Sequence, residues 1–217
     1  MKNDMIRPNI LGTKIIPNIS VEMAEKLKLK PHHKSLGLIT SDCDDVTYTA
    51  LDEATKAAEV DVVYAKSMYA GAGNASTKIA GEVIGIIAGP SPAEVRSGLN
   101  AIIDFMEYGA SFISANEDDS ISYYAHTISR TGSYLSKTAG IAEGEALAYL
   151  VAPPLEAMYA IDAALKAADV EMAEFFGPPT ETNFAGALLT GSQSACKAAC
   201  DAFAETVQFV ADAPQDY

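Results

Sequence analysis

The sequence predicts an α/β protein of two tandem domains, each with one sheet and helices on one face of that sheet. Three observations predict this fold: an internal repeat, strand-like segments at the same places around both copies, and a helix start signal. Residues 50–62 (ALDEATKAAEVDV) align without a gap on residues 160–172 (AIDAALKAADVEM), with seven identical positions of thirteen. A period of 110 residues is about half of the chain and too long for a solenoid repeat, so each copy is expected to be one domain.

The first unit is expected to contain four strands and two helices. Apolar or alternating runs predict strands at residues 9–16, 35–40, 60–64 and 81–87. The repeated segment forms a helix between the second and third of these strands. A second helix opens with Ser91-Pro-Ala-Glu94, a capping box with proline at the first helical position. An apolar stripe at helical spacing continues this helix through Met106.

The second unit follows the same order. Strands are expected at residues 121–128, 146–151, 170–176 and 185–189, with the second copy of the repeat helix after the second strand. A last helix begins after Gly191-Ser192. Strands interleaved with two helices in each unit favour an α/β domain with one helical layer. We therefore divide the chain into domains 1–113 and 114–217.

Composition and charge exclude several classes of protein. With 49% hydrophobic residues, each half can bury a core. The formal net charge of −14 disfavours nucleic acid as a partner, because phosphate binding needs clustered Lys and Arg. No apolar run approaches the roughly 18–20 residues of a membrane span, and the first residues lack the apolar core of a signal peptide. We therefore expect a soluble cytosolic protein with no membrane partner.

The sequence contains no catalytic motif. It has no phosphate-binding glycine loop of the Walker type, no strand-linked GxGxxG and no GxSxG. We therefore expect no enzymatic activity, no cofactor and no metal. Cys196 and Cys200 share a helix face and are either small buried residues or a metal pair. His32 and His33 are either a solvated loop pair or metal ligands.

Two long loops stand at the same point of the repeat. Residues 65–80 join two strands of the first unit, and residues 177–183 join the equivalent strands of the second. Strand connections of this kind usually have about 2–5 residues, and much longer ones are usually functional or disordered. The two interpretations are tolerated surface excursions and a movable flap at a shared feature of an assembly.

Six segments resemble one known family and together extend along most of the chain. They are SLGLI (35–39), DDVTY (44–48), DEATK (52–56), SRTGSYLS (129–136), YLVAPPLEA (149–157) and LTGSQSACKAAC (189–200). With the repeated A-x-D-A-x-x-K-A-A-x-V pattern, they resemble the shell proteins of bacterial microcompartments. Within that family, the chain is similar to the tandem-domain shell proteins of ethanolamine-utilisation microcompartments.

The resemblance implies an α+β fold of two circularly permuted shell domains, each a mainly antiparallel sheet with helices on one face. It implies a homotrimer shaped like a hexagon, which tiles with other shell proteins into the wall of a microcompartment in the cytoplasm. It also implies a gated central pore for a metabolite or cofactor. The pore loops would include these residues of the two long loops: Tyr69, Gly71, Gly73, Asn74, Thr180 and Glu181.

The resemblance further implies an ethanolamine site that regulates the pore. Asp44, Asp45 and Glu82 match the acidic positions of the family, since an ammonium group needs carboxylates and carbonyl oxygens. The other residues that the resemblance implies are Phe112, through its backbone carbonyl, Thr182, Asn183 and Phe184. The residues alone leave other roles open, because either aspartate is a good helix N-cap and Glu82 suits an exposed strand position.

A second hypothesis from another class is a stand-alone acidic sensor or enzyme with a pocket between its two domains. A shell tile should be an obligate trimer without turnover, whereas this alternative predicts a monomer that binds or converts a small molecule. The oligomeric state therefore discriminates the two hypotheses.

Overall fold

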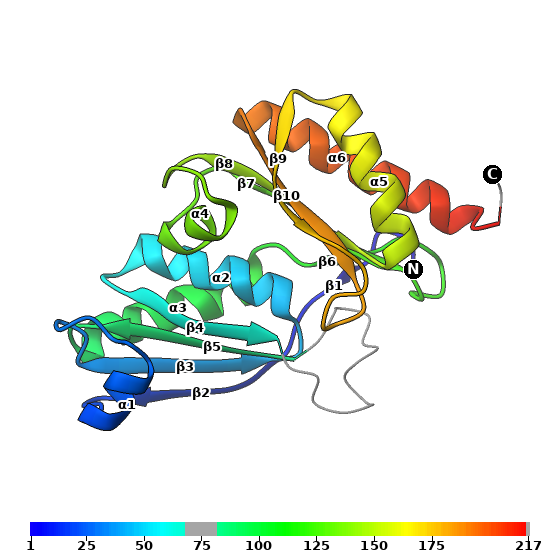
Figure 1. Cartoon of the computed structure of the whole chain (residues 1–217). Coiled ribbons are helices and arrows are strands. Elements are labelled where there is room, and N and C mark those ends of the chain that lie inside the picture. Colours follow the sequence, from blue (N-terminus) through cyan, green and yellow to red (C-terminus); the bar gives the residue numbers. More distant parts are fainter. Residues whose placement is uncertain (68–81, 216–217) are drawn as a thin grey trace.

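The computed structural model describes residues 1–67 and 82–215, in which two sheets and two helix pairs alternate as four layers (Figure 1). The first sheet contains, in spatial order, β2 (Ile10–Ile16), β3 (Ser35–Ser41), β5 (Val83–Gly89) and β4 (Asp61–Ser67). Helices α2 (Asp44–Ala57) and α3 (Pro92–Tyr108) cover one face of it.

The second sheet lies on the other side of α2 and α3 (Figure 1). Its strands, in spatial order, are β1 (Met5–Ile6), β6 (Phe112–Ser114), β7 (Ser122–Ile128), β8 (Ala146–Ala152), β10 (Ala185–Gly191) and β9 (Val170–Phe176). Helices α5 (Pro154–Ala167) and α6 (Gln193–Asp212) cover its outer face, and two short helices, α1 (Val21–Lys26) and α4 (Ser133–Ala139), follow β2 and β7. Every strand pair of the described residues is antiparallel.

The expected repeat is confirmed. After β2 and β7, both units run helix, strand, helix, strand, strand, helix, and α5 begins 110 residues after α2 (154 − 44). The expected strands and helices are present, with ends that differ by a few residues. Ser91 Oγ accepts the Glu94 N–H at 3.3 Å, so α3 starts where the capping signal predicts.

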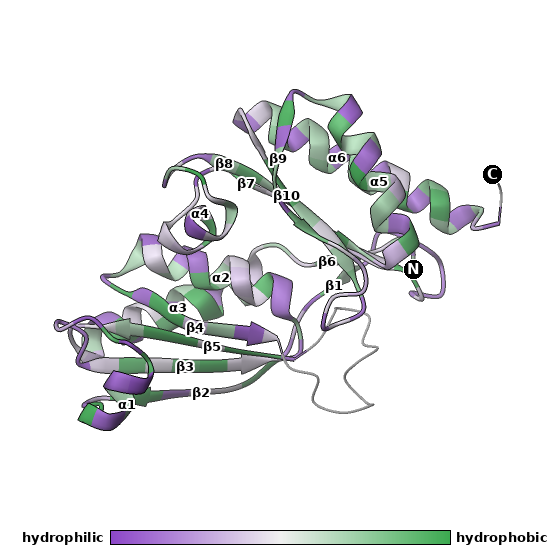
Figure 2. Cartoon of the chain, in the orientation of Figure 1, coloured by the Kyte–Doolittle hydropathy of each residue, from purple (hydrophilic) through white to green (hydrophobic). Residues whose placement is uncertain are grey.

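The second sheet separates two cores because β8 alternates between them. Leu147, Tyr149 and Val151 pack toward α2 and α3, whereas Ala148 and Leu150 pack toward α5 and α6. Successive side chains of a strand point to opposite faces, so a strand with both faces covered is apolar throughout. Along α5 and α6, green and purple residues alternate in Figure 2, the pattern of helices with one buried face.

Asp52, one of the identical residues of the repeat, joins the two units. Its buried carboxylate accepts hydrogen bonds from the Gly132 N–H at 2.7 Å and the Leu135 N–H at 2.8 Å, at the start of α4. Glycine permits this approach, because a Cβ at Gly132 would lie 2.7 Å from the Asp52 backbone oxygen. The equivalent Asp162 is exposed and pairs with Lys166. The same residue therefore holds α4 in one copy and faces solvent in the other.

The N-terminal segment adds a feature that the repeat does not show. Strand β1 pairs with β6, with Met5 opposite Ile113, and so extends the edge of the second sheet. The expected boundary between residues 113 and 114 lies inside β6. The two units are therefore joined by strand pairing as well as by the packing of α2 and α3 on the second sheet.

Two expectations about single residues have different outcomes. Cys196 and Cys200 are buried thiols on α6, as expected for small interior residues. His33 is not solvated: it is buried, and its Nε2 lies 2.9 Å from Asp61 Oδ2, while His32 is exposed. Among the described residues, no helix combines the length and the apolar content that crossing a membrane requires.

Candidate functional site: an acidic pocket between the two units

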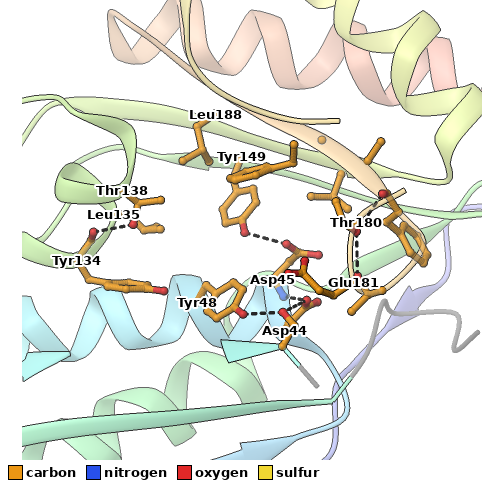
Figure 3. Close-up of a pocket in the computed structure, with 17 residues that line it drawn as sticks. Asp44, Asp45, Tyr48, Tyr134, Leu135, Thr138, Tyr149, Thr180, Glu181 and Leu188 are labelled. Atoms are coloured by element: carbon orange, nitrogen blue, oxygen red, sulfur yellow. Dashed lines mark hydrogen bonds between the residues drawn. The ribbon is translucent and has the colours of Figure 1, made fainter. Parts of the chain in front are cut away.

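A cavity of about 220 Å³ lies where the first turn of α2 meets the second sheet (Figure 3). Its walls come from both units, because α2 and the end of β4 face α4, β8, β10 and the loop between β9 and β10. The lining residues are Asp44, Asp45, Tyr48, Ser67, Tyr134, Leu135, Thr138, Tyr149, Val151, Phe176, Thr180, Glu181, Thr182, Phe184, Ala185, Gly186 and Leu188.

Two adjacent carboxylates form the polar end of the pocket. Asp44 and Asp45 are buried in the first turn of α2, where the positive end of the helix dipole favours negative charge. The Tyr149 hydroxyl donates to Asp45 Oδ1 at 2.8 Å, and the Ser67 hydroxyl donates to Asp44 Oδ2 at 2.5 Å. Because the single Ser67 proton is used there, the Tyr48 hydroxyl, 2.6 Å away, donates to Ser67.

Neither aspartate caps the helix. The N-cap is Cys43, which makes no side-chain capping bond, and Asp44 Oδ1 accepts the N–H of its neighbour Asp45 at 2.9 Å. The N-cap alternative for these two residues is therefore wrong. Both carboxylates are turned instead toward the pocket and its hydroxyl groups (Figure 3).

Burial without a cation disfavours ionisation of this pair. Burial raises the pKa of Asp44 to about 6, and burial together with the charge of Asp44 raises the pKa of Asp45 further. None of the ion pairs among the described residues involves either carboxylate. A cation in the pocket would favour the ionised forms of these acids, so the pair can bind a cationic ligand through charge and hydrogen bonds.

The loop between β9 and β10 closes the pocket from the second unit. Thr182 is buried, and the Thr180 hydroxyl and N–H both donate to the Phe184 carbonyl, at 3.0 and 3.1 Å. Thr180, Glu181, Thr182 and Phe184 all line the cavity. Thr180 and Glu181, which the resemblance assigns to the pore loop, therefore lie in the same wall as Thr182 and Phe184. The resemblance assigns these last two residues to the ligand site.

The other expected ligand residues lie outside the cavity wall. Phe112 is fully buried and stacks on Tyr124, with its ring 5.9 Å from that of Phe184. Asn183 is exposed, has a left-handed backbone (φ 65°) and forms the turn of the loop. Glu82 is half-buried and directly precedes β5. The expected pore residues Tyr69, Gly71, Gly73 and Asn74 lie outside the described residues.

Sequence reasoning missed the tyrosines of the pocket. Tyr48 lies one turn after Asp44 on the same face of α2, and this spacing was a usable signal. Tyr149 belongs to the alternating face of β8 that packs toward α2. Tyr134 comes from α4, and its ring centroid lies 6.3 Å from that of Tyr48. No local pattern indicates the contact of Tyr134 with α2, because these residues are far apart in the sequence.

Comparison with known proteins gives a consistent family assignment. Residues 35–116 match the model of the BMC domain. The chain is 84% identical over 214 residues to the bacterial microcompartment shell protein EutL of Clostridium perfringens (strain 13 / Type A), covering 99% of each chain. A crystal structure of EutL from Clostridium perfringens superposes with a TM-score of 0.95, at 83% identity and over 100% and 99% of the two chains. A trimeric bacterial microcompartment shell protein, PduB, has the same fold, with a TM-score of 0.77 at 21% identity over 94% and 89% of the chains.

Proposed function

The chain belongs to the EutL family of bacterial microcompartment shell proteins, and on this premise we propose that it forms a homotrimeric tile that binds ethanolamine and couples it to a gated pore. Its place in the shell of the ethanolamine-utilisation system, and its role as a structural protein rather than an enzyme, come with the family. The ligand, the trimer and the pore are the proposal.

The observation that carries the ligand proposal is the buried pair Asp44 and Asp45 at one end of a cavity. The ammonium group of ethanolamine has one positive charge and three donors, which match two carboxylates without a cationic partner among the described residues. The ligand hydroxyl has a donor and an acceptor for Thr182 or for the pocket tyrosines. Glu82, half-buried before β5, is proposed to add negative charge from outside the wall.

The layer order supports the trimer. Among residues 1–67 and 82–215, the helices of the first unit are covered by the sheet of the second, but the helices of the second unit have no such cover. Leu155, Met158 and Tyr159 on α5 are 61%, 46% and 59% exposed and lie on one face of the helix. We propose that the outer face of the first sheet in another copy covers them. Such a head-to-tail interface closes into a ring when the rotation fits.

The position of the β9–β10 loop supports coupling between ligand and pore. A ligand shifts a two-state loop only by binding its two states with different affinity. Contacts with Thr180, Glu181 and Thr182 supply that difference, so ethanolamine should favour the ordered, closed arrangement. Hydrogen exchange of residues 177–184 should slow in saturating ethanolamine, by a factor that corresponds to about 1–3 kcal/mol. An unchanged hydrogen-exchange rate would refute the coupling between ligand and pore, but it would not contradict the proposed binding of ethanolamine.

Titration calorimetry of ethanolamine tests the ligand proposal directly. The Asp44→Asn variant keeps the shape of the side chain and removes its charge, so it should weaken binding about tenfold or more. Asp201→Asn is the matched control, because Asp201 is an exposed acid paired with Lys197 on α6. Glu82→Gln should weaken binding less than Asp44→Asn if Glu82 acts from outside the wall. Equal affinities for the wild type and Asp44→Asn would show that this pocket is not the ethanolamine site.

A further inference from the structure

The pocket has a second end, which a two-carbon amino alcohol bound at Asp44 and Asp45 would leave unfilled. In Figure 3, Asp44 and Asp45 lie to the right of the Tyr149 ring, whereas Tyr134, Leu135 and Thr138 of α4 lie to its left. Leu188 of β10 and Val151 of β8 also line the cavity. The side chains named here are aliphatic, aromatic or hydroxyl-bearing.

The cavity is also larger than a molecule of ethanolamine. An apolar protein cavity of about 150 Å³ accommodates benzene. The pocket here has about 220 Å³, which is enough volume for an aryl group together with a short aminoalkyl chain. The tilted rings of Tyr48 and Tyr134, at an interplanar angle of 51°, leave aromatic edges and faces with which a third ring can pack.

We propose that the pocket takes primary amines that carry a compact apolar group, with arylethylamines as the best-fitting class. The ammonium group would bind Asp44 and Asp45, and the ring would lie among Tyr134, Leu135 and Leu188. This inference rests on the proposed amine site and adds its ligand class. It makes the apolar end a determinant of specificity, so the same site would respond to amines other than ethanolamine.

Titration calorimetry with two amines that differ only by the ring tests the inference on the full chain. We expect 2-phenylethylamine to bind at least about tenfold more tightly than ethylamine, because burying an aromatic ring is favourable by this order or more. 2-Phenylethanol, which has the ring without the charge, is the control for nonspecific apolar binding and should bind far more weakly. Equal affinities of the two amines would overturn the inference.

A substitution at the rim of the apolar end tests where the aromatic ring of the ligand lies. Thr138 is exposed and its hydroxyl donates to the Tyr134 carbonyl at 3.1 Å, so Thr138→Phe fills this end with little effect on the core. The variant should weaken binding of 2-phenylethylamine more than binding of ethylamine and so remove the tenfold preference, whereas the smaller change Thr138→Ser should preserve that preference. A preference that survives in Thr138→Phe would contradict the assigned position of the ring.

The outcomes separate this inference from the proposed function. Binding of ethanolamine without any preference for the aryl amine overturns the inference and supports the ethanolamine site. Binding of 2-phenylethylamine without measurable binding of ethanolamine supports the inference and refutes ethanolamine as the ligand. Binding of neither amine overturns both.

Discussion

Asp44 and Asp45 are adjacent in the sequence, and the first turn of α2 buries both of them. A buried carboxylate is costly unless it is neutral or paired, and here the hydroxyl groups of Ser67 and Tyr149 provide the hydrogen bonds. The raised pKa values of both acids show that burial favours the protonated forms of the pair when no cation is bound. An ammonium ion favours the ionised forms, so its binding should release protons.

Asp45→Asn tests this interpretation through the pH dependence of stability. In the wild type the pKa of Asp45 is higher in the folded than in the unfolded chain, so the unfolded chain ionises first as pH rises. The free energy of unfolding therefore falls from about pH 4 upward until the folded pKa is reached. Asparagine mimics the protonated acid, so the variant should be more stable than the wild type by about 1–2 kcal/mol at about pH 7.5, with a smaller gain at about pH 5.

Urea unfolding at a fixed protomer concentration measures this difference at both pH values. Added ethanolamine should stabilise the wild type more than Asp45→Asn, because the variant has lost one of the two carboxylates. A variant that is less stable than the wild type at both pH values would mean that Asp45 is ionised and stabilising in the folded chain.

At the scale of elements, the contact between α2 and α4 positions the aromatic side of the pocket. Helix α4 has seven residues, Ser133–Ala139, and its N-cap is Gly132, which offers no capping side chain. Asp52 of α2 supplies the missing acceptor from the other unit. By contrast, α1, the equivalent of α4 in the first unit, has its own cap, because Ser20 accepts the Met23 N–H.

Paired substitutions at the equivalent aspartates test this role. Asp52→Ala leaves two amide groups without their acceptor in a buried place, which should cost about 2–4 kcal/mol of unfolding free energy. Asp162→Ala removes the same residue from an exposed i,i+4 pair and should leave stability within experimental error. Urea unfolding of both variants, compared at equal protomer concentration, checks the difference. Equal losses for the two variants would argue against the interdomain cap.

At the scale of the whole molecule, the two repeats differ in what covers their helices. The residues of α2 that face the second sheet include Asp45, Tyr48 and Thr49, and the Tyr124 hydroxyl donates to Thr49 at 3.0 Å. The residues 110 positions later are Leu155, Met158 and Tyr159, the exposed apolar residues of α5. The covered face of α2 therefore corresponds to an exposed apolar face on α5. An exposed apolar face indicates an interaction partner, which is a neighbouring copy in the proposed trimer.

Leu155→Glu tests the trimer at this face. A charge buried in an apolar interface without a partner should weaken association about tenfold or more. Analytical ultracentrifugation should show a trimer for the wild type and a concentration-dependent loss of trimer for the variant. An unchanged far-UV circular dichroism spectrum controls for folding. A wild-type chain that stays a folded monomer at micromolar concentration would refute the assembly.

The sequence alone determined the two-unit organisation and the order of strands and helices, because periodicity and caps are local properties of the chain. The sequence itself contains the repeat at Asp52 and Asp162, the capping signal at Ser91 and the alternating strand patterns. Local patterns indicate which face of an element is buried, but not what buries it.

The tertiary structure decided the partners of those faces. It placed Tyr149 on Asp45, 104 residues away, and Tyr134 beside Tyr48, and so made a pocket from two units. It also gave the identical aspartates of the repeat different roles, since only Asp52 meets a second unit within the chain. Such contacts depend on how layers stack, and stacking is a long-range property that no short segment of this sequence specifies.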